Sequence, residues 1–291
     1  MKKYRSFFFI VVISFLIAFL FYYFTRNSEL EESITYFPED AKLDYIYNNT
    51  SLTIKPQNQG KHFKVLWQTS SKTNQQVYLR EDVSLLYNNG RLTSILSKWR
   101  QNVQTLNQEK TLDFDESGHF EAITIHHAEK HADQNITGKD VMSYDQRYVM
   151  VSANQPISIF KVPVTPEELG WYHVLDSSVK TEQREILEEA AEQFHIHPAA
   201  YFIFPLTYLH VYNQNILPGL DKKTSHRAVS QLWEGLYKNY ILGIKLKENQ
   251  VEDPIGSSMP IILYDKNSTH FLVITKTRSG KLALFKQKIK S

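Results

Sequence analysis

The feature that most constrains this chain is an uncharged apolar run near its N-terminus, residues 6–24, SFFFIVVISFLIAFLFYYF. A helix of roughly 17–25 residues crosses a hydrocarbon core of about 30 Å, and the run has that length. Lys2, Lys3 and Arg5 precede the run, whereas Arg26 and then three glutamates follow it. Because cytoplasmic flanks are rich in Lys and Arg, the N-terminus is predicted to be cytoplasmic and the bulk of the chain extracytoplasmic.

The run is interpreted as an uncleaved single-pass signal anchor that contacts membrane lipid. A cleaved signal usually has a shorter apolar core followed by small residues, and Thr25-Arg26-Asn27-Ser28 offers no such site. Cleavage and burial in a soluble fold are the two alternatives. Residues 1–25 are therefore assigned to a cytoplasmic tip and transmembrane anchor, and the polar, acidic residues 26–43 to a stalk.

Charge and cysteine content exclude several functions. Residues 1–26 hold four of the 33 Lys and Arg residues and none of the 31 acids. The remainder is near neutral, so no nucleic-acid partner is expected. The absence of cysteine excludes thiol nucleophiles, thiolate zinc sites and disulfides. A cysteine-free extracytoplasmic domain fits a Gram-positive cell envelope better than a eukaryotic secretory route.

Beyond the stalk the pattern predicts an α+β fold, with a β-rich region at 44–163 and an α+β region at 164–291. Asn89-Gly90 is typical of a type I′ hairpin leading into a strand at 91–96. A second hairpin is predicted to join 112–114 to 119–125 through Asp115-Glu116-Ser117-Gly118. Other candidate strands are Lys64–Ser70, Val77–Arg80, Ser84–Tyr87, Arg147–Ala153 and Pro156–Val162.

The second region begins with a helical block and closes with a β meander. Thr165-Pro166-Glu167-Glu168 forms a capping box that begins a helix, and the apolar spacing predicts a clearer helix at 181–194. A kinked buried helix is expected at Ala199–Val211, a further helix at Ser225–Asn239, and strands near 260–265, 270–277 and 281–289. No flexible linker marks residues 160–165, so the two regions are either separate domains or parts of one.

Two segments resemble metal sites. Asp113, Asp115, Ser117 and Gly118 match the opening of a calcium loop, but Thr124 stands where a bidentate Glu is expected. A turn with solvated acids is the favoured interpretation of that segment. The other segment gathers imidazoles and carboxylates within eight residues: His126, His127, Glu129, His131 and Asp133.

Geometry argues against a metal site at 126–133. On a strand His126 and His127 point to opposite faces, and only a helical segment would bring His127 and His131 together. The string HHAEKH is also not H-E-x-x-H, so it lacks the general-base glutamate of a zinc peptidase. A surface or hydrogen-bonded histidine cluster is the favoured interpretation.

Other catalytic patterns are incomplete. Ser158-Ile-Phe-Lys161 and Ser177-Ser-Val-Lys180 match the Ser-x-x-Lys pattern of penicillin-binding enzymes at the frequency expected by chance, and no Ser-Asp-Asn element occurs. The segment Glu185–Pro198 resembles the first helix and turn of lytic transglycosylase-like domains. That family places a catalytic Glu shortly after the Pro, whereas here 207–209 is Thr-Tyr-Leu, so no general acid can be assigned.

The C-terminal segment contains six basic residues and no acid: Lys276, Arg278, Lys281, Lys286, Lys288 and Lys290. Lys286, Lys288 and Lys290 would share one face of a strand, where they could meet anionic headgroups or wall polymers. The favoured interpretation is that these lysines keep an edge strand from pairing with other chains.

No catalytic, cofactor-binding or metal-binding residue is assigned from the sequence. The leading hypothesis is a single-pass, extracytoplasmic accessory or regulatory protein that binds an envelope or membrane protein and has no catalytic activity. The alternatives are a wall-active or metal-dependent hydrolase and a sensor of an anionic envelope ligand.

Overall fold

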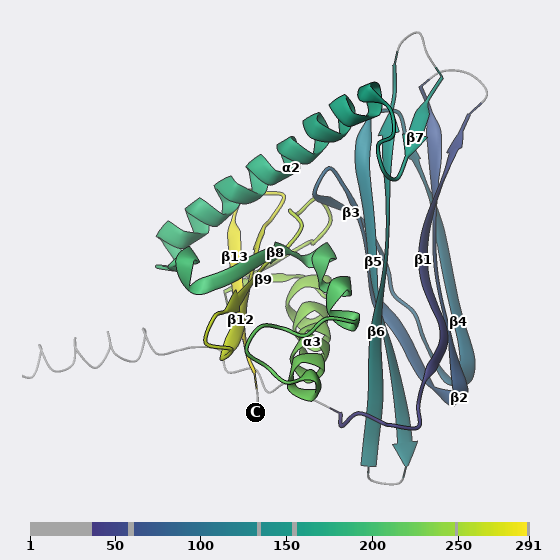
Figure 1. The fold of residues 1–291 in the computed structure, drawn as a ribbon, viewed down its shortest axis with the longest axis vertical. Coiled ribbons are helices and arrows are strands. Elements are labelled where there is room, and N and C mark those ends of the chain that lie inside the picture. The colour runs from purple at the N-terminus through teal and green to yellow at the C-terminus, as the bar shows by residue number, and fades with distance from the viewer. Residues whose placement is uncertain (1–36, 58–60, 133–134, 153–155, 248–249, 290–291) are drawn as a thin grey trace, which may run out of the picture. The chain divides into compact units, whose positions relative to one another are not determined.

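A single 26-residue strand organises the first half of the domain. In the computed structural model, which describes residues 37–57, 61–132, 135–152, 156–247 and 250–289, this strand is β2 (Phe63–Asn88). It merges three strands that the sequence predicts separately. Its first part lies between β1 (Tyr45–Pro56) and β4 (Trp99–Phe114), and its second part between β3 (Arg91–Leu96) and β5 (Gly118–Ala132). β6 (Asn135–Met150) and β7 (Ser158–Phe160) extend the second part (Figure 1).

β2 bends between Lys72 and Val77, where its register against β4 is irregular. The bend turns the two parts of the sheet toward each other. Phe63, at the start of β2, contacts Phe120, which pairs with Asn88 at the other end of the same strand. Apolar side chains from both parts are buried together between the layers: Leu52, Phe63, Val65, Trp67, Leu86, Phe120, Ala122 and Val149. This half is therefore a β-sandwich folded from one sheet.

The first predicted hairpin is confirmed and the second is wrong. Asn89 and Gly90 have φ of 48° and 72°, and Asn88 pairs with Arg91 across the turn. β4 and β5 are consecutive, but they do not pair with each other in the described sheet. Their short link instead crosses from one layer to the other, where Phe114 packs against Phe120. The sequence pattern is the same for a hairpin within one layer and for a link that crosses between layers. The bend in β2 decides which of the two forms.

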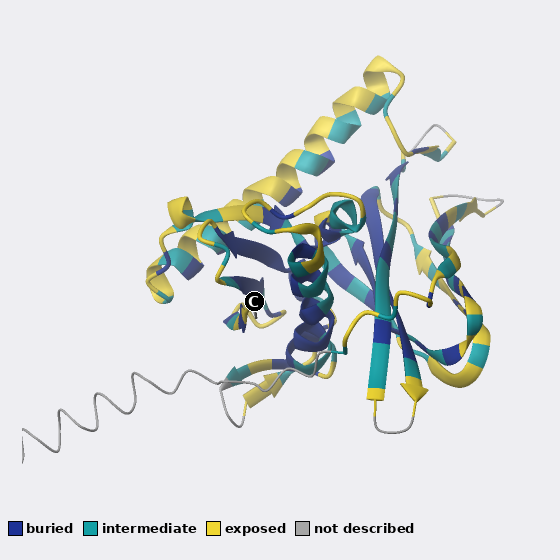
Figure 2. Cartoon of the chain, turned by 60° about the horizontal axis from the view of Figure 1, so that its bottom comes forward, coloured by how far each residue is buried: buried dark blue, intermediate teal, exposed yellow. Residues whose placement is uncertain are grey.

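One 28-residue helix, α2 (Pro166–Gln193), joins the two predicted helices of the helical block. The capping box is confirmed, since the Thr165 side chain accepts from the Glu168 N–H and the Glu168 carboxylate accepts from the Thr165 N–H. Leu175 packs near β6 and β7, whereas Ile186 and Ala190 pack on a second sheet. α2 therefore spans both sheets while most of its surface stays exposed (Figure 2).

The second sheet has the antiparallel order β13-β12-β11-β8. Its strands β11 (Ile261–Asp265), β12 (His270–Lys276) and β13 (Leu282–Lys288) confirm the predicted meander. The kinked helix expected at 199–211 is wrong in its first half. Tyr201–Pro205 is strand β8, because its aromatic and β-branched residues pair with β11, and only Leu206–Asn213 is helical, as the 3₁₀ segment η2. A short 3₁₀ turn, η1 (Pro198–Ala200), precedes β8.

α3 (Lys222–Leu236) lies buried between the two sheets (Figure 2). It confirms the helix expected at 225–239 and continues as a π-helical turn, η3 (Tyr237–Ile241), before the hairpin of β9 (Ile244–Lys247) and β10 (Gln250–Glu252). Its buried face packs in one apolar cluster with β2, β5 and the second sheet. The result is a mixed, strand-rich fold. The predicted anchor at 6–24 lies outside the described residues, and none of the helices described is long and apolar enough to span a membrane.

The turn at Gly90 yields a stability prediction. A Cβ at Gly90 would lie 3.1 Å from Val179 Cγ1 of α2, whereas one at Gly280 would meet nothing within 4 Å, although both glycines have positive φ. We expect each change to Ala to cost about 1 kcal/mol of unfolding free energy for backbone strain. Gly90→Ala should cost about 1 kcal/mol more, because Val179 must move. Urea unfolding measures both losses. If Gly90→Ala and Gly280→Ala lost the same unfolding free energy, α2 would move away from the new methyl group at no cost.

Candidate functional site

The polar groups of the domain concentrate where β2 carries a bulge. Arg80 pairs with His127 and Val83 with Ile125, so two residues of β2 lie opposite one of β5. A regular strand would put Arg80 and Val83 on opposite faces, but the extra residue keeps both on the face covered by α3. Glu81 and Asp82, the residues inside the bulge, are fully buried. Each of these carboxylates therefore needs internal partners.

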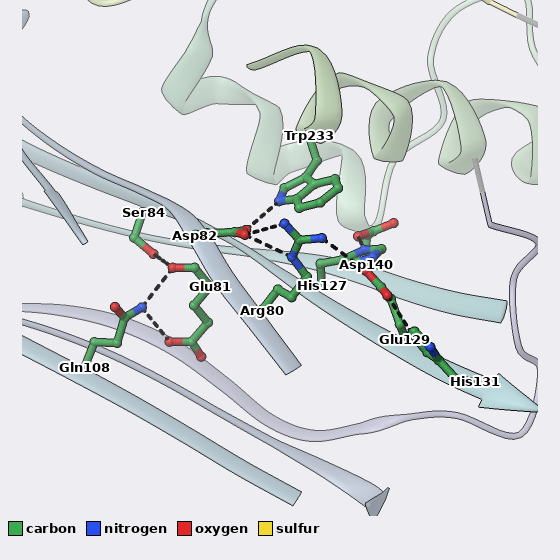
Figure 3. A network of polar contacts seen from close by, with 10 residues as sticks. All are labelled: Arg80, Glu81, Asp82, Ser84, Gln108, His127, Glu129, His131, Asp140 and Trp233. Atoms are coloured by element: carbon green, nitrogen blue, oxygen red, sulfur yellow. Dashed lines mark hydrogen bonds and ion pairs between the residues drawn. The ribbon is translucent and has the colours of Figure 1, made fainter. Parts of the chain in front are cut away.

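On the α3 face, Asp82 and Arg80 form the centre of a charged network (Figure 3). The Arg80 Nε and Nη2 atoms donate to Asp82 Oδ2 at 2.9 and 2.7 Å, and Nη1 reaches Glu129 Oε1 at 3.4 Å. Trp233 of α3 donates from Nε1 to Asp82 Oδ1 at 3.2 Å. Asp82 thus connects β2 to α3 through Trp233.

Trp233 also stacks on two cationic groups of the sheet. The Arg80 guanidinium carbon lies 4.5 Å from the centre of the indole ring, and the His127 ring stacks on it at 4.5 Å and 12°. Tyr237, one turn further along, stacks on Trp233 at 6.0 Å. Since planar cations attract aromatic faces, these contacts add to the hydrogen bond from the indole.

His127 is held between two carboxylates. Its Nδ1 lies 2.5 Å from Asp140 Oδ1 and its Nε2 lies 3.0 Å from Glu129 Oε1, while His131 Nε2 reaches the other oxygen of Glu129 at 2.8 Å. Burial opposes the charged form of His127, but the charge of Asp140 and the hydrogen bonds outweigh it and raise the pKa to about 9. Burial likewise opposes ionisation of Glu129, yet its hydrogen bond with His127 and the nearby cations lower its pKa to about 2. Both groups are charged at neutral pH.

Inside the sandwich, Glu81 accepts hydrogen bonds from Thr69 and Ser71 at 2.7 and 2.6 Å and lies 3.1 Å from His126 Nδ1. Burial opposes its ionisation, but the hydrogen bond with His126 and the hydroxyls hold the pKa of Glu81 below its usual range. The chain of contacts continues from His126 Nε2 to Ser143 Oγ at 2.7 Å. Ser143 in turn lies 2.6 Å from Thr50 Oγ1 on β1.

Ser143, His126 and Glu81 thus have the order of a nucleophile, a base and an orienting acid. Their surroundings indicate a structural role. His126 and Glu81 are fully buried between the layers, so the imidazole has no open path to a leaving group. The Ser143 hydroxyl is shared with Thr50, which connects β6 to β1 across the sandwich. We interpret the chain as the internal connection of the two layers.

A third polar group connects η2 to the first sheet. Glu121 accepts from Tyr144 at 2.9 Å and from Thr207 at 3.0 Å. Asn213 donates to the Met142 carbonyl at 2.6 Å and accepts from the Met142 N–H at 3.0 Å, so its side chain replaces a strand partner for β6. These contacts and Trp233 together hold the second sheet on the first.

The two segments weighed as metal sites do not bring their side chains around one point. His126 and His127 point to opposite faces of β5, as predicted, and His127 and His131 meet only through Glu129. Asp133 lies outside the described residues. In the segment that resembles a calcium loop, the Ser117 hydroxyl already accepts a hydrogen bond from the Val151 N–H at 2.8 Å. Within the described ranges no group of three His, Cys, Asp or Glu side chains could hold a metal ion.

The other candidate residues also have ion-pair partners. Lys161 pairs with Asp145 at 2.7 Å and Lys180 with Asp176 at 2.8 Å, so each lysine of a Ser-x-x-Lys match has a carboxylate partner. Lys276 pairs with Glu189 and Lys281 with Glu252. Lys286 and Lys288 are exposed on β13, as expected for an edge strand, and Lys290 lies outside the described residues. The basic C-terminus is therefore partly neutralised within the domain.

Sequence reasoning missed Arg80, Glu81, Asp82 and Trp233, which form the centre of both networks. The signal was present as three consecutive charged residues inside an otherwise alternating strand pattern. Such a run conflicts with the period of a strand and indicates a bulge. Comparison of the chain with protein-family models, curated proteins and solved structures found no match.

The raised pKa of His127 predicts how stability depends on pH. A folded-state pKa near 9 against 6.5 in the unfolded chain means that this stabilisation is complete below pH 6.5 and is lost as pH rises through 9. The unfolding free energy of the wild type should therefore exceed that of His127→Gln at low pH. This difference should fall by on the order of 3 kcal/mol between pH 6 and 10. Urea unfolding across that range measures it. His197→Gln, at an exposed histidine, is the control, and a constant difference for His127→Gln would contradict the assignment.

The Arg80–Asp82 ion pair yields a second prediction. Asp82→Asn leaves the Arg80 guanidinium without its main counter-charge, so we expect a loss of about 3 kcal/mol in unfolding free energy. Asp113→Asn removes an aspartate that is 77% exposed and 3.8 Å from Lys64, and it should change stability by less than about 0.5 kcal/mol. Similar losses for both variants would show that the buried pair has no special role.

Proposed function

We propose that this chain is a membrane-anchored, extracytoplasmic accessory or regulatory protein that binds another envelope protein and has no catalytic activity. In this proposal residues 6–24 supply the anchor and the domain described above supplies the binding surface. The observation that carries it is an exposed aromatic surface at β8 and η2.

This surface, which we term the aromatic strip, consists of Phe202, Tyr208 and Tyr212 around the buried Phe204. Phe202 and Tyr208 are 37% and 46% exposed. The rings of Phe204, Tyr208 and Tyr212 contact one another at 5.5–6.2 Å, so this part of the strip is continuous. Exposed apolar patches of this kind mark interaction sites, and aromatic residues are enriched at interfaces.

The electrostatics of the strip also favour a protein partner. From His195 to Leu220 the sequence contains no Asp, Glu, Lys or Arg. By contrast, the charged side chains of the two networks are buried and engaged with one another, which supports a binding role over a hydrolytic one.

The Ser143–His126–Glu81 order keeps a hydrolase as the second candidate. A fluorophosphonate probe applied to the folded chain would label Ser143 if the serine were an activated nucleophile. We expect no labelling, because the base is fully buried. Labelling that disappears in Ser143→Ala would favour the hydrolase instead.

Photocrosslinking in cells tests the proposed function. A photoreactive residue replacing Tyr208 in the full-length, membrane-anchored chain should capture one specific envelope protein. The matched control is Tyr47 on β1, which is 50% exposed. Capture of the same proteins at both positions, or of none at Tyr208, would contradict a partner at the aromatic strip.

A further inference from the structure

The backbone of β8 has one edge that the fold does not use. In the ladder with β11, the Leu206 N–H donates to the Pro260 carbonyl and the Lys266 N–H donates to the Ala200 carbonyl. Because such bonds alternate along an antiparallel strand, Phe202 and Phe204 also point their backbone groups at β11. Ile203, between them, points its N–H and C=O in the opposite direction.

That opposite direction is the outer edge of the second sheet. β8 is the last strand in the order β13-β12-β11-β8, and the part of the chain that the structure describes supplies no strand beyond it. The Tyr201 N–H is taken by the Pro198 carbonyl. The outer edge therefore centres on the donor and acceptor of Ile203, with the Tyr201 carbonyl beside them.

The two edges of this sheet differ in a way that indicates their roles. β13, at the far edge, exposes Lys286 and Lys288, and lysines on an edge oppose the addition of another strand. β8 has the sequence Tyr-Phe-Ile-Phe-Pro, without a charge and without a register shift against β11. Pro205 at one end and the engaged Tyr201 N–H at the other limit the length of a strand that could pair there.

Charge and shape specify what fits this edge. Lys266 places its ammonium group 5.7 Å from the centre of the Phe202 ring and donates to the Ala199 carbonyl, and the surrounding segment 195–220 carries no carboxylate. A strand added at this edge would lie beside two side chains of β8: Ile203 on the face of the sheet that α2 covers, and Phe202 on the opposite face. The matching segment is uncharged and apolar on both faces, with an acid tolerated only near Lys266.

We propose that β8 receives an extended, uncharged segment of the partner protein as a fifth strand, hydrogen-bonded to the backbone of Ile203. This inference rests on the proposed function, because it names how the partner of the aromatic strip is held. Main-chain hydrogen bonds would supply the attachment, and the apolar side chains on both faces would supply the selectivity.

The orientation of Ile203 allows a selective test. Ile203→Pro removes an N–H that points away from β11, so the sheet keeps its ladder, and an edge strand tolerates proline at such a position. Ile203→Val keeps the N–H and the branched side chain. Ile203→Lys keeps the N–H but places a charge on the edge, as on β13.

Each variant is made in the full-length chain that carries the photoreactive residue at position 208. We expect Ile203→Val to retain the crosslink, whereas Ile203→Pro and Ile203→Lys should reduce it by about tenfold or more. An unchanged thermal midpoint shows that the variants are folded. The crosslinked peptide, identified by mass spectrometry, should be an uncharged segment of a different protein.

Other outcomes separate the two proposals. A specific partner whose crosslink survives both Ile203→Pro and Ile203→Lys would overturn strand addition but leave the proposed function intact. A crosslink to a helical or charged segment would do the same. Capture of a second copy of this chain, or of residues 1–36 of the same chain, would overturn the partner strand. If the chain with the photoreactive residue at position 208 and an unchanged Ile203 captured no specific protein, both the proposed function and the strand addition would be overturned.

Discussion

Two carboxylates in the interior of the domain, Glu81 and Asp82, need partners that only distant parts of the chain can supply. Glu81 is satisfied by Thr69, Ser71 and His126, which meet only because β2 bends and brings its two parts face to face. Asp82 is satisfied by Arg80 and by Trp233 of α3. The sandwich and the attachment of the second sheet therefore depend on the same bulge. Unpaired, either charge would cost several kcal/mol.

Much of the local structure could be predicted because it depends on neighbours in sequence. The Asn89-Gly90 turn, the Thr165 capping box and the closing meander follow from residues a few positions apart. The failures are non-local. The sequence near Thr73 does not indicate that β2 bends, so the local pattern predicts a hairpin of β4 and β5 that does not form. Tyr201–Pro205 has an apolar pattern that fits a buried helix or a strand, and its pairing with β11, some 60 residues away, decides between them.

The site shows the same division. Strand alternation was sufficient to place His126 and His127 on opposite faces. It could not reveal that Glu81 faces the first and Asp140 the second, since those pairs depend on strand order. Of the two lysines with catalytic spacing, Lys161 is paired with Asp145 of β6 and Lys180 with Asp176 of its own helix. Residue types alone therefore offered only incomplete catalytic patterns and missed the charges that hold the domain together.

The way the second sheet is attached has a mechanical consequence. The chain enters through the first sheet, where Pro38 and Asp40 bond to Gly138, while the edge of β8 belongs to the second. Tension between residues 38–40 and a strand bound at β8 would therefore pass through the contact between the two sheets. Trp233, Asn213 and the long span of α2 all lie across that contact and would share the load. The hydrogen bonds from Trp233 to Asp82 and between Asn213 and Met142 would then be among the contacts that break if the two sheets separate.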